Sequence, residues 1–108
     1  MNIPRAKGSV SAPSGRRPVL VIQSNQFNRS RIGTTVVVSL TSNLKLGQAE
    51  GNIYLQGKAT GLDRDSVVNV SQISTLDKSA LDELICSLND AVMERVEEGL
   101  KLVLGFLF

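Results

Sequence analysis

The apolar positions of this chain form short β-branched runs first and a helical stripe last. Most residues at 18–23 and 34–40 are Val, Leu, Ile or Thr, a composition that is typical of strands buried on both faces. Shorter runs at 53–56 and 66–73 predict two more strands. The connections between these runs are too short for crossover helices, so we expect a mostly antiparallel sheet.

The last fifth of the chain follows a helical period instead. Asn89 or Asp90 supplies an N-cap, and Gly105 supplies a stop. A short helical turn is expected near 77–83, whereas 84–88 fits either a strand or an extension of that turn. The helical stripe consists of Val92, Met93, Val96, Leu100, Val103 and Leu104.

This order of elements predicts one small α+β domain, because strands come first and a helix closes the chain. The 108 residues suffice for a single domain, with a core small enough that dimerisation would add stability. Residues 1–14 are rich in Gly, Ser and Pro and show no period, so they are expected to form a flexible or divergent segment before a domain at 15–108.

Charge is distributed unevenly along the sequence. Seven basic and no acidic residues precede Glu50, while five basic and ten acidic residues follow from Glu50 onward, which gives +7 and −5 for a net charge of +2. Such asymmetry indicates a basic surface for a polyanion. Alternatively, the two halves pack together and their charges offset each other locally.

The composition also excludes several chemistries. The chain has no His and a single cysteine, Cys86, so it cannot form a Ser–His or Cys–His pair, an intrachain disulfide or a cysteine-based zinc site. Cys86 is expected in the core, and Asp63 and Asp65 are expected to be turn residues rather than calcium ligands. No run is long enough to span a membrane. We therefore expect no metal or cofactor, and a cytoplasmic protein.

Three blocks, taken in order, resemble the MazF/PemK toxin family of toxin–antitoxin systems. GRRPVLVIQSNQFNRSRIGTTVVVSLTSNLK (15–45) is similar to the arginine–proline strand, variable loop and following strand of the family. GLDRDSVVNVSQISTLDKSAL (61–81) is similar to its next strand and corner, and GLKLVLGF (99–106) to its closing helix. The order of the blocks is far more specific than any one of them.

The resemblance implies a fold, an activity and partners. The fold would be a small antiparallel, SH3-like barrel-type sheet with short helices, assembled as a homodimer. The activity would be that of an mRNA interferase, a metal-independent endoribonuclease that cuts single-stranded RNA at short sequences and leaves a 2′,3′-cyclic phosphate. A cognate antitoxin with an acidic C-terminal segment would inhibit it. One relative with this fold binds DNA gyrase instead, so a non-catalytic or degenerate member is the alternative.

The family's catalytic residues map onto three positions here. Its arginine before the strand proline corresponds to Arg17, its threonine after the second strand to Thr41, and its loop serine to Ser11, with Ser9 as the rival. Guanidinium stays protonated, so Arg17 would bind the phosphate bidentately rather than act as a base. Arg16 has no fixed family role and is expected to contact phosphate. From the residues alone, the alternative is that Thr41 is a strand-end turn former and that both arginines are solvated charges rather than phosphate ligands.

Further RNA contacts are expected from the segment after the first strand. Arg29, Arg31 and Lys45 would follow the RNA backbone electrostatically, and Phe27 would stack on a base or simply pack.

The N-terminal residues depart from the family pattern. Residues 1–14 lack the family's first strand and its glycine-rich loop. That strand is therefore expected to be missing or divergent, and 18–23 would then carry an open edge.

Overall fold

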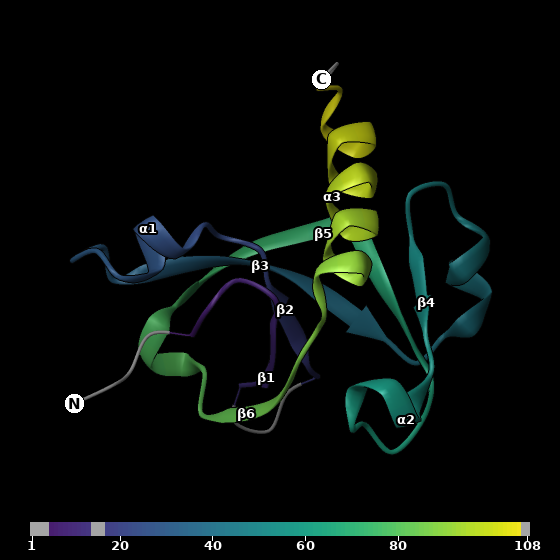
Figure 1. Ribbon diagram of the computed structural model, residues 1–108, viewed down its shortest axis with the longest axis horizontal. Coiled ribbons are helices and arrows are strands. Elements are labelled where there is room, and N and C mark those ends of the chain that lie inside the picture. The colour runs from purple at the N-terminus through teal and green to yellow at the C-terminus, as the bar shows by residue number, and fades with distance from the viewer. Residues whose placement is uncertain (1–4, 14–16, 107–108) are drawn as a thin grey trace.

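The computed structural model describes residues 5–13 and 17–106, and it shows one curled sheet with a helix packed against it (Figure 1). Arg16 lies outside the described residues. The sheet has six strands in the order β4-β5-β3-β2-β1-β6, and each described pairing is antiparallel. The strands are β1 (Ser9–Ala12), β2 (Val19–Val21), β3 (Thr34–Thr41), β4 (Ile53–Leu55), β5 (Ser66–Asp77) and β6 (Glu83–Ser87).

The helices lie in the connections and at the end of the chain. The short ones are α1 (Asn25–Asn28), η1 (Leu44–Gln48), α2 (Gly57–Thr60) and η2 (Lys78–Ala80). The long helix α3 (Asp90–Leu104) begins at Asn89, whose side chain accepts a hydrogen bond from the N–H of Val92 at 2.9 Å, and ends at Gly105 with a φ of 75°. The predicted α+β class and both ends of this helix are confirmed.

The expectation of an open edge on the first predicted strand is wrong. β1 pairs with β2 through Val10↔Leu20 and Ser11↔Val19, and its other edge pairs with β6. The sequence SVSA carries one β-branched residue and two serines, so it shows no strand signal of its own. Its strand state comes from pairing with neighbours on both sides. The ambiguous run 84–88 lies largely within the strand β6.

The core occupies both faces of the central strands. On one face, β2 and β3 contribute Leu20, Val38 and Leu40. The other face buries Val19, Val21 and Val37 together with Leu81. Burial on both faces explains why these two strands read as nearly continuous apolar runs. The larger cluster consists of Val10, Leu20, Val38, Leu40, Ile53, Leu55, Val68, Val70, Met93 and Val96.

The first four residues of the helical stripe pack into or against this core, and the last two do not. Met93 and Val96 are buried, whereas Val103 and Leu104 are exposed by 43% and 51%. Cys86 packs partly buried against the larger cluster, as predicted, and burial raises the pKa of its thiol. The exposed end of α3 is therefore an apolar surface that no described residue covers.

Candidate active site at the ends of β2 and β3

The pairing of β2 with β3 brings the two main candidate residues together. Val19 lies opposite Ser39 and Val21 opposite Val37, and extending this register by two residues sets Arg17 opposite Thr41. The N–H of Leu40 donates to the carbonyl of Pro18 at 3.1 Å and continues the ladder in that direction. A cavity of about 220 Å³ opens here, lined by Arg17, Pro18, Leu40, Thr41, Ser42, Leu62, Asp63, Arg64 and Ser66.

Arg17 enters this cavity from the start of a rigid strand. It is exposed, and Pro18 follows it with a restricted φ. No described acidic side chain forms an ion pair with Arg17. The guanidinium is therefore available for a ligand, and its planar set of donors matches two oxygens of a phosphate.

Thr41 ends β3 and has a hydroxyl with two possible uses. Its side chain is 7% exposed, and Oγ1 accepts a hydrogen bond from the N–H of Asn43 at 3.1 Å. Thr41 therefore does form part of the turn that follows the strand. Because the oxygen acts only as an acceptor in this bond, the hydroxyl proton remains available for donation into the cavity.

The connection from α2 to β5 adds residues that the sequence did not single out as functional. Leu62, Asp63 and Arg64 line the cavity beside Arg17. Arg64 belongs to the block 61–81 that carries the family resemblance, but no family role attaches to it. The signal that could have found it is a second arginine in a turn rich in aspartate, and that signal is common on protein surfaces.

Asp65 holds this connection in place. Its carboxylate accepts a hydrogen bond from the N–H of Gly57 at 2.8 Å and another from the hydroxyl of Tyr54 on β4. The Tyr54 hydrogen bond lowers the pKa of Asp65, with a further contribution from Gly57, and the same bond raises the pKa of Tyr54. The prediction that Asp65 is a turn residue is confirmed.

The two candidate serines do not line the cavity. Ser11 is fully buried in β1, and its Oγ has no hydrogen-bond partner among the described residues. Ser9 is also buried, with 3% exposure. Neither serine is among the residues that line the cavity with Arg17 and Thr41, and both are buried in β1.

The candidate RNA contacts after β2 lie far from the cavity. Phe27, Arg29 and Arg31 are exposed around α1, which Figure 1 shows at the opposite end of β3 from α2. β3 has eight residues from Thr34 to Thr41, so at about 3.3 Å per residue the two ends are roughly 23 Å apart. Lys45 is exposed on η1, the short helix that follows β3.

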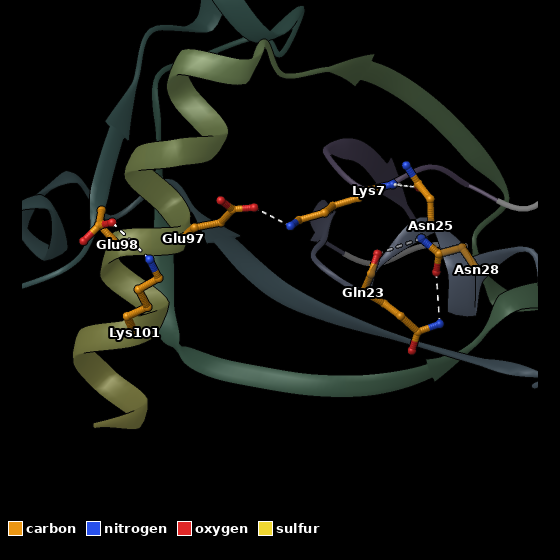
Figure 2. A network of polar contacts seen from close by, with 7 residues as sticks. All are labelled: Lys7, Gln23, Asn25, Asn28, Glu97, Glu98 and Lys101. Carbon is orange, nitrogen blue, oxygen red and sulfur yellow. Dashed lines mark hydrogen bonds and ion pairs between the residues drawn. The ribbon is translucent and has the colours of Figure 1, made fainter. Parts of the chain in front are cut away.

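A buried asparagine fixes the loop that carries these arginines (Figure 2). Asn28 is 2% exposed, and its Oδ1 accepts hydrogen bonds from Gln23 Nε2 at 3.0 Å and from Thr35 Oγ1 at 2.9 Å. Its Nδ2 donates to the carbonyl of Gln23 at 2.8 Å. Lys7 links the same loop to α3, because its N–H donates to Asn25 Oδ1 and its ammonium pairs with Glu97.

Charge offset between the two halves of the chain is limited. The ion pairs among the described residues are Lys7–Glu97 and Lys101–Glu98. Lys7 is thus the one described basic residue of the first half that pairs with an acid. The interpretation of offsetting charges fails for the four described candidate cations, which are Arg17, Arg29, Arg31 and Lys45.

Two further features complete the description. Within residues 5–13 and 17–106, no group of three or more His, Cys, Asp or Glu side chains is placed to hold a metal ion. None of the helices described has the length and apolar character needed to cross a membrane.

Comparison with known proteins assigns this chain to the small toxins of the MazF type. A family model of the PemK-like, MazF-like toxins of type II toxin–antitoxin systems matches residues 2–104. The chain belongs to this family, as the three sequence blocks predicted. Its class is therefore that of the MazF-type toxin endoribonucleases.

Relatives and solved structures agree with this assignment. The chain is 45% identical over 96 residues to endoribonuclease MazF6 of Mycobacterium tuberculosis (strain ATCC 25618 / H37Rv), covering 89% of this chain and 84% of the relative. It is 35% identical over 97 residues to endoribonuclease EndoA of Bacillus subtilis (strain 168), covering 90% and 83%. A solved endoribonuclease from Mycobacterial species superposes with a TM-score of 0.84 at 25% identity, covering 100% of this chain and 97% of that one.

Proposed function

We propose that this chain is a ribosome-independent mRNA interferase that cuts single-stranded RNA through attack of the 2′-hydroxyl, without a metal ion. The products would be a 2′,3′-cyclic phosphate and a free 5′-hydroxyl. The observation that carries the proposal is the meeting of Arg17 and Thr41 on one cavity at the ends of two paired strands.

The two residues would act on the scissile phosphate. Arg17 would bind two phosphate oxygens, and the Thr41 hydroxyl would donate to one of them. These contacts strengthen as negative charge builds on the phosphorane, so they stabilise the transition state more than the bound substrate. Arg64 lines the same cavity and adds a second positive charge.

The distant cations would hold the flanking RNA. Arg29 and Arg31 carry no ion pair with any described acid and stand roughly 23 Å from the cavity along β3. An extended single strand reaches both places, whereas a mononucleotide does not. Phe27 is 49% exposed and would offer a stacking surface. Lys45 would add a further phosphate contact, and so would Arg16, which precedes Arg17 in the sequence.

The partners follow from the family. A type II toxin is paired with an antitoxin, and we propose that an acidic C-terminal segment of that antitoxin competes with RNA for the basic residues. We further propose a cytoplasmic homodimer. The uncovered apolar end of α3, with Leu102, Val103 and Leu104 each 43% to 52% exposed, supports the dimer. Light scattering at micromolar concentration should give twice the mass of the chain, and a monomer mass would contradict the dimer.

The deciding experiment is cleavage in EDTA. Purified protein is incubated with a mixed-sequence single-stranded RNA pool, and the new ends are mapped chemically. The proposal predicts cuts at a short sequence with 2′,3′-cyclic phosphate ends, and no cuts in the same pool made with 2′-O-methyl ribose. Folded protein that cuts no RNA would overturn the proposal and favour a non-catalytic, target-binding member of the fold.

A further inference from the structure

The two aspartates of the turn GLDRDS have different surroundings. Asp65 uses its carboxylate to hold Gly57 and Tyr54, so it fulfils the structural role that a turn requires. Asp63 makes no hydrogen bond or ion pair with any described residue, and it lines the cavity together with Arg17 and Thr41. The carboxylate of Asp65 is thus occupied by hydrogen bonds, whereas that of Asp63 is available for a ligand in the cavity.

The proposed reaction lacks a proton acceptor. The chain contains no His, and a guanidinium does not lose its proton in proteins. Among the residues that line the cavity, the polar side chains are those of two arginines, one threonine, two serines and Asp63. A carboxylate is ionised at neutral pH and is the one ordinary base in that set.

The electrostatics of the cavity allow a carboxylate to stand beside a phosphate. A lone carboxylate would repel the RNA backbone, but Arg17 and Arg64 line the same cavity and leave it with a net positive charge. Neither arginine forms an ion pair with Asp63. The carboxylate therefore keeps its lone pairs free to accept a proton.

We infer that Asp63 is the general base that removes the proton of the attacking 2′-hydroxyl, an inference that rests on the proposed function. The proton moves from the 2′-oxygen to the Asp63 carboxylate as the 2′-oxygen forms its bond to phosphorus. The bond between phosphorus and the 5′-oxygen breaks, and the 5′-oxygen takes a proton from a water molecule. The resulting hydroxide then takes the proton from Asp63, which restores the carboxylate.

A different role for the same side chain makes a different prediction. An aspartate can accept a hydrogen bond from the amino group of cytosine and so select a base. In that case Asp63 would change which RNA sequence is cut, and the pH dependence of the rate would stay the same. The two roles are therefore separable by measuring the rate against pH.

The test compares Asp63→Asn with the parental protein and with Asp82→Asn, a matched change at an exposed aspartate outside the cavity. The single-turnover rate is measured in EDTA at saturating protein from pH 6 to pH 9 on the single-stranded RNA that the parental protein cuts. Binding is measured on the 2′-O-methyl version of that RNA, which lacks the reacting hydroxyl. Circular dichroism and the urea midpoint confirm that the variants are folded.

We expect Asp63→Asn to lower the rate at neutral pH by about 10²-fold, the size of a general-base contribution. The parental rate should be nearly flat with pH, because the base is in place throughout this range and guanidinium groups stay protonated in proteins. The variant should instead gain about tenfold per pH unit as hydroxide replaces the lost base. Binding to the 2′-O-methyl RNA should be equal or tighter, because a negative charge has been removed.

The outcomes separate the inference from the proposed function. A parental protein that cuts RNA, with Asp63→Asn cutting at the same rate or with a flat pH profile, overturns the inference and leaves the function in place. A changed cleavage sequence at an unchanged pH profile assigns Asp63 to base selection and also overturns it. A folded parental protein that cuts nothing overturns both.

Discussion

Arg17 and Thr41 lie 24 positions apart in the sequence and meet because of one strand register. The Thr41 hydroxyl accepts a hydrogen bond from the N–H of Asn43. This bond orients the oxygen and leaves the hydroxyl proton available to donate to a ligand. In the proposed mechanism, this hydroxyl is one preorganised hydrogen-bond donor to the phosphate.

Replacing Thr41 with valine tests that donor, because valine keeps the shape and removes the hydroxyl. We expect Thr41→Val to lose about 10²-fold in the single-turnover cleavage rate, as is typical for one lost transition-state donor. Thr41→Ser keeps a hydroxyl and should stay within a few-fold of the parental rate. A parental rate in Thr41→Val, with circular dichroism unchanged, would show that the hydroxyl serves only the turn at Asn43.

Residues of the site differ in how far the sequence could predict them. Arg17 and Thr41 follow from the family resemblance, because they adjoin strands with strong β-branched signals. Ser11 was expected beside them but is buried within β1, since a strand forms there without a strand-like sequence. Asp63 and Arg64 were not predicted as site residues. The turn that carries them is held by the hydrogen bonds of Asp65 to Tyr54 and Gly57, and residue spacing does not predict these bonds.

The secondary-structure elements also differ in how far the sequence could predict them. The runs at β2 and β3 predicted strands because burial on both faces demands apolar side chains at every position. The ends of α3 were predicted because capping needs particular residues at particular positions. The sequence left open whether β6 is a strand or a helical turn, because a five-residue run is too short to show a period. In the structure it is a strand that pairs with β1.

The packing of α3 against the turn before β4 depends on two glycines, Gly99 and Gly51. A Cβ built on Gly99 would come within 3.1 Å of the carbonyl carbon of Gly51 and nearer still to its oxygen. Gly51 has a φ of 87°, which favours glycine at that position too. The helix therefore approaches the turn at a distance that leaves no room for a side chain.

Gly99→Ala forces atoms into a packed site against backbone, which costs up to about 3 kcal/mol. Alanine returns about 1 kcal/mol in a helix interior, so we expect a net destabilisation of up to about 2 kcal/mol. Gly33→Ala is the matched control, because a Cβ there meets nothing within 4 Å; it should change the free energy of unfolding by less than about 0.5 kcal/mol. Urea denaturation measures both, and a Gly99→Ala variant more stable than the parent would contradict this packing.

The connection that carries Asp63 and Arg64 should loosen in acid. Hydrogen bonds from Tyr54 and Gly57 lower the pKa of Asp65 in the folded state. Its stabilising contribution is therefore present above the unfolded pKa of about 3.9 and is lost as pH falls through the lower folded pKa. Asp65→Asn should have a lower thermal midpoint than the parent at pH 7, and the gap should narrow below about pH 4. A gap that stays constant across this range would show that the ionised carboxylate is not what stabilises the turn.

At the scale of the whole molecule, positive charge lies at both ends of β3 and not only at the cavity. Arg17 stands at one end of the strand, and Arg29 and Arg31 stand at the other, roughly 23 Å away. The ion pairs described elsewhere use Lys7 and Lys101. An extended polyanion that spans this length therefore meets cations without an ion pair to any described acid at both of its ends.

RNA affinity should consequently fall steeply with salt. About four phosphate contacts give a slope near −3 for the logarithm of the binding constant against the logarithm of salt concentration on single strands. Removing two contacts in the double variant Arg29→Ala, Arg31→Ala should reduce the slope by about 1.4, while Arg95→Ala on α3 should leave it unchanged. Fluorescence anisotropy with 2′-O-methyl RNA measures the slopes, and a slope near zero for the parental protein would contradict the basic surface.

The most direct test of the central claim is the single-turnover cleavage rate of Arg17→Ala in EDTA, measured beside its affinity for 2′-O-methyl RNA. If Arg17 stabilises the phosphorane, the rate should fall by about 10²-fold or more, equivalent to about 3 kcal/mol. Affinity should fall much less, because the other cations remain and the lost contact is strongest in the transition state. Arg17→Lys should recover only part of the rate, because a point charge lacks the bidentate geometry. Cleavage by Arg17→Ala at the parental rate would contradict the assignment of this cavity as the catalytic centre.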